Sequence, residues 1–445
     1  MTYRVWDRRI NNLMNLGRIT QLFQVEYFRH TVTLVSSAAL AQIIGLLVYP
    51  LLTRLFTPAH FGELSVYLSV SMILSILASG RYEQAILLPR RNEHALQLLQ
   101  LALFVSVVTM ALLFIFLLFM RDWVSSVLGV PEISFWLLTL PVYVMIMVAC
   151  QAFTFYFNRH KQYNAIAAYN ISQSAASSAM RVGFGFLKTG GGGLILGSLL
   201  GYAGGLLAFL FPFFKKHGNG KVLFKSTLVK KRAKEYINFP RFRMVHLFLN
   251  YFSGNLPVLL LSSWFSSSAA GIYSLGYTVV SRPANLFLNS VERTFSQRII
   301  EKKNNEQPLL FDFQRLVRSM FLLALVTFIP IWLAAPFVFT LVFGKAWAES
   351  ATYFRIILPW MFMFFLATPL SFLPDFFMQQ KKAMWIEAVQ LVLRIIALTA
   401  GLVLKNPHLG MVFYSAIGVG IYGYCLWWYY TLVKKHDNQL QASIT

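Results

Sequence analysis

Apolar and polar residues follow one another along this chain in long blocks. Between residues 31 and 433, apolar runs of roughly 18 or more residues recur, and each is about as long as a helix needs to cross a bilayer. A soluble helical protein cannot bury so many segments that are apolar on all sides. The breaks between the runs divide the chain into about twelve predicted spans, at residues 31–52, 64–88, 98–120, 134–156, 163–187, 191–214, 244–263, 270–292, 317–343, 352–378, 383–404 and 409–433.

The stretch from residue 51 to residue 95 shows this pattern most clearly. It completes one apolar span, turns at Thr57-Pro58 through a short polar link, runs a second span, and ends in a charged cluster at Arg81 and Glu83. The pattern predicts a membrane hairpin with charges at one mouth. Residues two positions apart point to different sides of a helix, so Arg81 and Glu83 are not expected to pair.

The spans also divide the chain into two halves. Six precede residue 215 and six follow residue 243, with the longest basic link between them. An even number of spans in each half predicts two six-helix lobes in parallel orientation. The expected parts are an interfacial N-terminal segment, an N-lobe, a basic linker, a C-lobe and a tail, at residues 1–30, 31–214, 215–243, 244–433 and 434–445.

Composition and charge agree with this division. The chain is 57% hydrophobic and only 12% charged, as expected for an integral membrane protein. With the N-terminus inside, the predicted cytoplasmic segments hold 30 of the 39 lysines and arginines, and the opposite face holds five. This bias follows the positive-inside rule and predicts that both termini are cytoplasmic. The net charge of +23 therefore reflects membrane topology, and it does not indicate a nucleic-acid partner.

Motifs for enzymatic chemistry are not found in the sequence. It contains no H-E-x-x-H, no Walker A and no G-x-S-x-G motif, and no soluble insertion large enough for a catalytic domain. The two cysteines, Cys150 and Cys425, lie in different spans without the spacing of metal ligands. We therefore expect a protein that is not an enzyme and that needs neither a cofactor nor a metal.

Polar residues inside the spans are the candidates for function, because polarity in lipid is costly and usually faces a cavity or a partner helix. In the eighth span, Arg282, Asn285 and Asn289 share one helix face, and Pro283 opens the backbone beside them. Asn250 lies in the seventh span. Arg282 is interpreted either as a cavity residue that contacts an anionic ligand or as a structural or snorkelling side chain.

Three further polar features have structural interpretations beside functional ones. Glu387 and Arg394 lie seven residues apart in the eleventh span, and they are interpreted as a structural ion pair or as a site that couples transport to an ion. His246 is interpreted as an interhelical hydrogen-bonding residue or as part of a proton relay. The fifth span carries Arg181 and is rich in small residues, and these small residues favour a close-packing surface.

Two stretches carry a family resemblance. "LLTRLFTPAHFGELSVYLSV" followed by "SGRYEQAILLPRRNEHALQL" resembles the N-terminal signature of bacterial polysaccharide biosynthesis flippases, and "AAGIYSLGYTVVSRPANLFLNSVERTFSQ" resembles their eighth span. These proteins include the O-antigen and exopolysaccharide flippases of the multidrug/oligosaccharidyl-lipid/polysaccharide exporter superfamily. The chain departs from many members at Phe295-Ser296-Gln297, where they continue with a proline.

The resemblance implies a V-shaped bundle of twelve helices around a central cavity. It further implies transport of undecaprenyl-pyrophosphate-linked oligosaccharides across the bacterial inner membrane, with membrane lipids and the polysaccharide polymerase machinery as partners. By position, Arg282 and then Arg81 would meet the pyrophosphate, with Asn250, Asn285 and Asn289 as hydrogen-bonding residues.

Two other functions remain open at this point. A drug or small-cation antiporter of the same superfamily would be favoured by acidic residues lining the N-lobe cavity, where the spans offer little besides Glu83. A membrane enzyme of surface polysaccharide assembly would be expected to carry a sizeable periplasmic loop, whereas every predicted periplasmic link is short.

Overall fold

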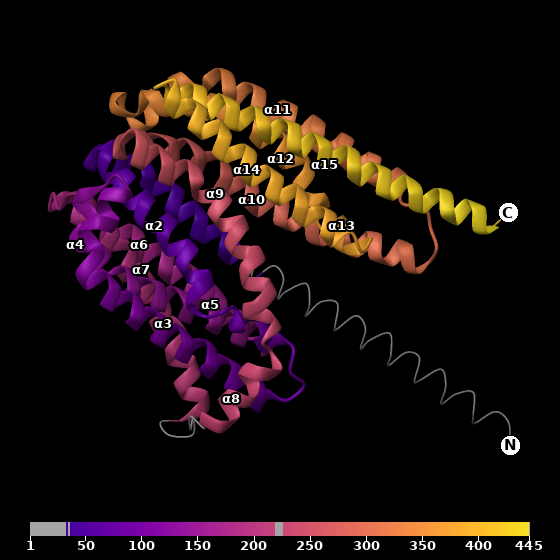
Figure 1. Ribbon diagram of the computed structural model, residues 1–445, viewed down its shortest axis with the longest axis horizontal. Coiled ribbons are helices and arrows are strands. Elements are labelled where there is room, and N and C mark those ends of the chain that lie inside the picture. Colours follow the sequence, from indigo (N-terminus) through magenta and orange to yellow (C-terminus); the bar gives the residue numbers. More distant parts are fainter. Residues whose placement is uncertain (1–32, 34–35, 219–225, 445) are drawn as a thin grey trace, which may run out of the picture.

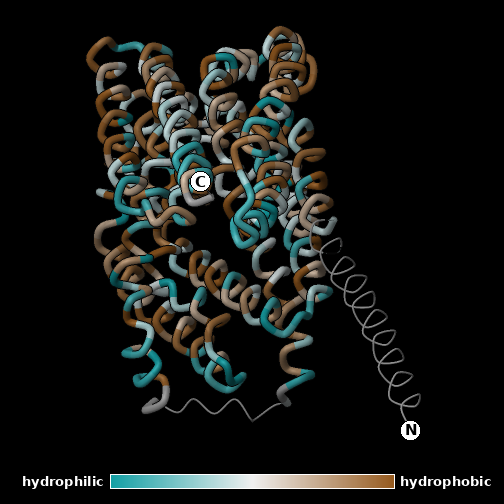
Figure 2. Tube along the Cα trace, turned by 90° about the vertical axis from the view of Figure 1, so that its right-hand side faces the viewer, coloured by the Kyte–Doolittle hydropathy of each residue, from teal (hydrophilic) through white to brown (hydrophobic). Residues whose placement is uncertain are grey.

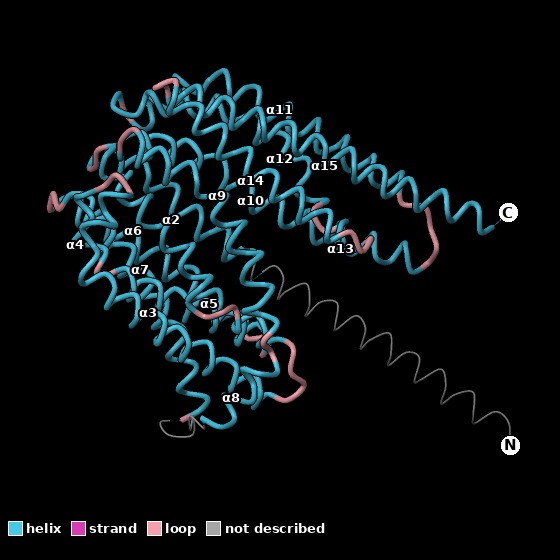
Figure 3. Tube along the Cα trace, in the orientation of Figure 1, coloured by secondary structure: helices cyan, strands magenta, loops and turns pink. Residues whose placement is uncertain are grey.

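The computed structural model describes residues 33, 36–218 and 226–444 of the chain. These residues form helices joined by short turns and contain no β-strand (Figure 3). The prediction of an all-α fold is therefore confirmed for the described part of the chain. The interfacial helix predicted within residues 1–30 lies outside the described residues.

Long helices follow one another through both halves of the described chain. The first half contains a helix over Ser36–Leu55, then α2 (Pro58–Ala78), α3 (Asn92–Val127), α5 (Leu140–Arg159), α6 (Tyr163–Phe186) and α7 (Gly190–His217). The second half contains α9 (Met244–Trp264), α10 (Ser267–Asn304), α11 (Leu310–Phe343), α12 (Ala348–Ala367), α14 (Gln380–Val403) and α15 (Pro407–Ile444). Shorter elements join them, namely η1 (Tyr82–Leu87), η2 (Pro131–Ile133), α4 (Ser134–Leu137), α8 (Ser226–Glu235), η3 (Phe239–Arg243), η4 (Lys345–Trp347), η5 (Thr368–Leu370) and α13 (Leu373–Phe376).

Most of these long helices have the composition of membrane spans. In the described part of the chain, 10 helices are long and apolar enough to cross a membrane. The helices α6 and α10 have 24 and 38 residues, but they are too polar to be among those 10. Together they agree with the prediction of about twelve spans, and the two polar helices carry the arginines considered below.

The charged mouth of the predicted hairpin differs from the expectation. The turn at Thr57-Pro58 is present, because the Thr57 hydroxyl accepts a hydrogen bond from the backbone N–H of His60 at 3.4 Å and caps α2. The predicted second span, residues 64–88, is too long at its end. Helix α2 ends at Ala78, and residues 82–87 form the separate element η1, whose apolar residues continue the hydrophobic pattern without continuing the helix.

The long helices gather into two bundles. Figure 1 shows the helices up to α7 in one bundle, here called the N-lobe, and α9 to α15 in a second bundle, the C-lobe. The lobes meet near α4 and the start of α10, here called the closed end, and diverge toward α8 and α13, the diverging end (Figure 1). This V shape confirms the expected architecture. Hydrophobic residues cover much of the length of the helices, while hydrophilic residues gather in the lower turns of the N-lobe (Figure 2).

Backbones from the two lobes touch at the closed end. A Cβ added to Gly62 of α2 would lie 1.8 Å from the carbonyl oxygen of Ser267, at the start of α10. Ser262 of α9 donates a hydrogen bond to the carbonyl oxygen of Leu128 at 2.8 Å. The indole of Trp347 donates to the carbonyl oxygen of Thr53 at 3.0 Å. These contacts hold the two lobes together at this end.

Small residues bring α6 and α7 together, as the composition of the fifth span predicts. A Cβ added to Gly201 of α7 would lie 2.4 Å from the Cβ of Ser177 on α6, and Ser177 is buried. Inside a membrane, helices associate through such close packing because lipid tails are as apolar as the side chains they would exclude. The close-packing interpretation of this span is confirmed.

Candidate functional site

Arg282 reaches from the C-lobe into the N-lobe. It is half-buried on α10, and its Nη1 lies 3.4 Å from the position that a Cβ would take on Gly45. Its guanidinium carbon lies 5.5 Å from the centre of the Tyr49 ring. Gly45 and Tyr49 both belong to the first helix, Ser36–Leu55. The guanidinium therefore lies against the first helix, in the opposite lobe.

A second arginine, Arg181 of α6, lies close to the first. Its Nε and Nη2 both donate to the hydroxyl of Ser198 on α7, at 3.2 and 2.7 Å, so that the guanidinium is fixed in orientation. It lies within electrostatic range of Arg282 and of Tyr49. Tyr49 is therefore a common neighbour of two arginines that come from opposite lobes.

The positive charges of these two arginines are not balanced by acidic residues. Among the residues that the structure describes, neither Arg181 nor Arg282 has a carboxylate within 4.0 Å. Bringing a charge out of water costs several kcal/mol unless an opposite charge compensates it. Two uncompensated guanidinium groups near each other therefore favour an anionic ligand between the lobes.

The three predicted asparagines lie on the neighbouring helices α9 and α10. Asn285 and Asn289 follow Arg282 along α10 at intervals of three and four residues, and both are exposed. Asn250 of α9 is exposed as well. Within the described part of the chain, no hydrogen bond engages any of the three side-chain amides, so donors and acceptors remain available between Arg282 and the diverging end.

The sequence matches a known family over most of its length. Residues 51–352 match the family described as "Polysaccharide biosynthesis protein". The chain belongs to this family. No similar sequence is found among the curated proteins.

Solved structures with the same fold are transporters by their descriptions. A structure described as "Lipid II flippase MurJ, inward closed conformation" aligns with a TM-score of 0.68 at 12% identity, over 91% of this chain and 90% of that one. An "inward-facing conformation of a multidrug resistance MATE family transporter of the MOP superfamily" aligns with a TM-score of 0.59 at 14% identity, over 91% and 95%. At these identities the likeness establishes the fold, which is that of a multi-pass membrane protein.

In this polysaccharide biosynthesis protein, the predicted site residue Arg81 is compensated internally. Its Nη1 lies 3.0 Å from Oε1 of Glu83, and the two residues are 5% and 0% exposed. Nη1 also lies 3.4 Å from the amide oxygen of Gln151. The expectation that Arg81 and Glu83 do not pair is wrong, because Arg81 has a left-handed backbone with φ of 62° and does not continue the helix.

Glu387 and Arg394, interpreted from the sequence as an ion pair or a coupling site, do not form an ion pair with each other. Glu387 instead lies 3.1 Å from Nε2 of His246 on α9. Arg394 donates to the hydroxyl of Ser253, also on α9, at 3.0 Å. A separation of seven residues corresponds to a rise of about 10.5 Å along a helix, so each side chain finds a nearer partner on α9. The ion-pair interpretation is therefore corrected, while the role of these residues stays a prediction.

Arg181 was not among the predicted site residues, although it is the lone charge of the fifth span. The small residues of its span correctly indicate packing against α7, but they do not indicate that the arginine lies near Arg282 of the C-lobe. The available signal was a lone charge in an otherwise uncharged span, which usually marks a functional position. Only the fold brings this residue near Arg282.

Proposed function

We propose that this protein is a flippase for undecaprenyl-pyrophosphate-linked oligosaccharide repeat units of a surface polysaccharide. It would move them from the cytoplasmic to the periplasmic leaflet of the bacterial inner membrane by alternating access. The observation that carries the proposal is that Arg181 and Arg282, from opposite lobes, lie near each other with no carboxylate of a described residue within 4.0 Å of either. Membership in the polysaccharide biosynthesis family supports the class of substrate.

The chemistry of a pyrophosphate fits these two arginines. A guanidinium group presents parallel N–H donors to two phosphate oxygens, and it stays charged at any physiological pH. The phosphates of a lipid-linked sugar would lose several kcal/mol or more on entering hydrocarbon without a partner. Two cations near the head group would lower this barrier, while the polyprenyl chain remains in the surrounding lipid.

The asparagines extend this site toward the sugar. Asn285 and Asn289 are exposed on α10 beyond Arg282, and Asn250 is exposed on the neighbouring helix α9. An exposed amide offers both a donor and an acceptor to sugar hydroxyls. In this arrangement the arginines hold the charged part of the head group and the asparagines contact the sugar.

The distribution of basic residues gives the direction of opening. It predicts that α8 and both chain termini lie in the cytoplasm, which makes the diverging end the cytoplasmic one. The lobes would then admit the head group from the cytoplasm, with the closed end sealing the periplasmic side. Alternating access requires these contacts to break while the lobes close at the other end.

Reconstituted transport tests the proposal. Proteoliposomes would contain undecaprenyl-pyrophosphate-linked saccharide with a fluorophore on the sugar, and a membrane-impermeant quencher would report the fraction on the outer leaflet. We expect the wild-type protein to flip this lipid. Arg282→Ala should slow flipping at least tenfold, and Arg282→Lys should retain part of the rate because the charge remains without the bidentate geometry.

The matched control is Arg121→Ala, which removes an arginine at the end of α3, away from the site. It should flip at the wild-type rate. Wild-type protein that leaves the labelled lipid in place but exchanges small organic cations for protons would refute the flippase and support the antiporter. Equal flipping by wild type and Arg282→Ala would refute the assignment of the site.

A further inference from the structure

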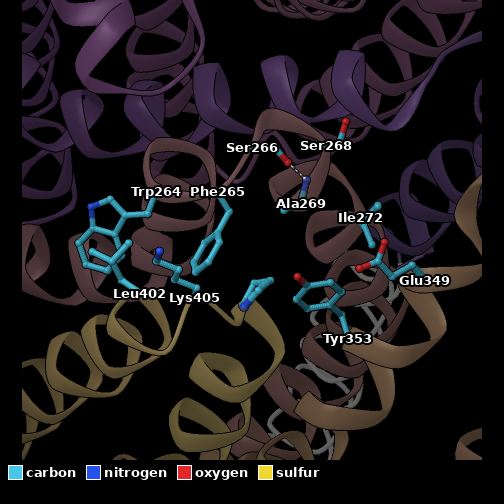
Figure 4. A pocket seen from close by; sticks show the side chains of 11 residues that line it. Trp264, Phe265, Ser266, Ser268, Ala269, Ile272, Glu349, Tyr353, Leu402 and Lys405 are labelled. Carbon is cyan, nitrogen blue, oxygen red and sulfur yellow. Dashed lines mark hydrogen bonds between the residues drawn. The ribbon is translucent and has the colours of Figure 1, made fainter.

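A pocket of about 570 Å³ lies in the C-lobe at the closed end, apart from the arginine site. It is formed where α9 passes into α10, and α12 and the turn between α14 and α15 complete its walls. Figure 4 shows side chains from these separate elements turned toward a common space. Its volume falls in the range of about 300–1,000 Å³ that is typical of sites for small ligands.

One polar group bordering the pocket is buried and unpartnered. Tyr353 of α12 is 0% exposed, and its hydroxyl has no hydrogen-bond partner among the described residues. In Figure 4 the hydroxyl points toward the space between Phe265 and Ile272. A buried hydroxyl without a partner costs about 1–3 kcal/mol, which a bound ligand with a donor or acceptor would recover.

Aromatic and charged groups stand together around the same space. Trp264 and Phe265 supply aromatic surface, and Glu349 and Lys405 supply a carboxylate and an ammonium group (Figure 4). Glu349 lies 3.2 Å from Nε2 of His408. Lys405 is exposed, and no hydrogen bond or ion pair to another described residue engages its ammonium group.

This combination distinguishes between classes of ligand. A lipid chain would cover the aromatic rings but leave Glu349 and Lys405 facing hydrocarbon, at a cost of several kcal/mol. An organic cation would suit Glu349 but would be repelled by Lys405. A sugar ring presents apolar C–H groups on its faces and hydroxyls at its edge, so it satisfies the aromatic and the polar residues together.

We infer that this pocket is a saccharide-binding site, in which Trp264 supplies the stacking surface and Tyr353, Glu349 and Lys405 hydrogen-bond the hydroxyls. That the bound sugar belongs to the transported lipid rests on the proposed flippase function, whereas binding of a free sugar does not. In the flippase, the site would lie at the predicted periplasmic end, where the head group leaves the closed contact between the lobes.

Saturation-transfer NMR on the full chain in nanodiscs tests this inference. The probes are free methyl glycosides of glucose, galactose, rhamnose and N-acetylglucosamine. We expect at least one of them to receive saturation from the wild-type protein. Tyr353→Phe, which keeps the ring and removes only the hydroxyl, should weaken this binding at least fivefold, and Trp264→Ala should abolish it.

The controls remove the same residue types elsewhere. Trp123→Ala deletes a tryptophan that is 61% exposed on α3, and Tyr424→Phe removes the hydroxyl of a tyrosine that is 40% exposed on α15. Both should bind like the wild type. The inference would be overturned by a wild type that binds none of the probes, or by binding that survives unchanged in both pocket variants.

Arg282→Ala separates this inference from the proposed function. This variant should lose flipping but bind free glycosides like the wild type, because Arg282 does not line the pocket. A wild-type protein that binds the glycosides but never flips the labelled lipid would refute the proposed function alone. Flipping without any glycoside binding would refute the pocket alone.

Discussion

The hydroxyl oxygens of Ser65 and Ser274 lie 2.6 Å apart, across the contact between the two lobes. Ser65 belongs to α2 and Ser274 to α10, so one hydrogen bond joins helices more than 200 positions apart in the sequence. If the protein works by alternating access, this contact must open in every cycle. Residues at the closed end therefore report on the conformational change more directly than residues of the arginine site.

A disulfide at these positions should arrest transport. In Ser65→Cys/Ser274→Cys, the two sulfurs should form a disulfide readily, because the hydroxyl oxygens that they replace lie only 2.6 Å apart. We expect flipping to stop under oxidising conditions and to recover with reductant. Maleimide labelling after denaturation reports the cross-link as the loss of the two introduced thiols. The native cysteines Cys150 and Cys425 are free, so they are labelled in both the reduced and the cross-linked protein.

Each single cysteine variant is the control for the pair. Both should flip normally under oxidising and reducing conditions, because neither can form the cross-link. Transport at the wild-type rate by a fully cross-linked protein would show that the lobes do not separate here during the cycle.

Gly62 should be intolerant of even one added methyl group. Its Cβ would lie 1.8 Å from a backbone oxygen of Ser267, so α2 and α10 must move apart to accommodate alanine. Overpacking of this kind costs about 1–3 kcal/mol, which corresponds to a roughly 5- to 150-fold lower population of the closed contact. In the double-cysteine background, Gly62→Ala should therefore slow disulfide formation.

The matched substitution is Gly183→Ala. Gly183 lies on α6 with no atom within 4 Å of its added Cβ, so the substitution changes nothing at the interface. It should cross-link at the rate of the parent. Equal cross-linking rates in the two alanine variants would contradict the prediction that the Gly62–Ser267 contact controls how often the lobes are closed at this end.

Arg181 and Arg282 should act as a unit. Free pyrophosphate should compete with the lipid-linked substrate, and Arg181→Ala and Arg282→Ala should each raise the concentration needed for half inhibition at least tenfold. If both arginines hold the same anion, the double variant should be less impaired than the product of the single effects. Ser198→Ala should be milder, since it releases the orientation of Arg181 but keeps its charge.

Multiplicative effects of the two arginine substitutions would contradict a shared anion site. So would normal pyrophosphate inhibition in the double variant. The control is again Arg121→Ala, which should leave inhibition unchanged.

The sequence predicted the membrane fold well because hydrophobic blocks of span length have few alternatives. The predictions were wrong or incomplete where the backbone leaves the helical conformation and where a polar residue meets a partner from a distant helix. Helix α2 ends at Ala78, whereas the prediction continued the span to residue 88 because apolar residues continue through η1. Hydropathy does not reveal that Arg81 has a left-handed backbone. One of the two arginines of the site was predicted, because Arg282 is a charged residue near the middle of its span. Arg181 joins the site only because the fold brings α6 close to α10.

The pair of Arg81 and Glu83 allows a last prediction that separates structure from transport. Both residues are buried, and Ser79 also donates a hydrogen bond to Glu83. Glu83→Ala leaves the Arg81 charge unpaired, which typically costs about 3–5 kcal/mol. We expect a markedly lower melting temperature of the purified protein. Replacing both, as Arg81→Met/Glu83→Leu, removes the uncompensated charge and should restore most of the stability.

The double variant also decides whether Arg81 contacts the substrate, as the family resemblance implies. Since it is expected to be stable, its flipping rate is free of the folding defect that complicates the single variants. In the structure the Arg81 charge is already satisfied by Glu83, in contrast to that of Arg282, so we expect near wild-type flipping. A stable double variant that cannot flip the labelled lipid would place Arg81 on the transport path and would require the Arg81–Glu83 contact to open during the cycle.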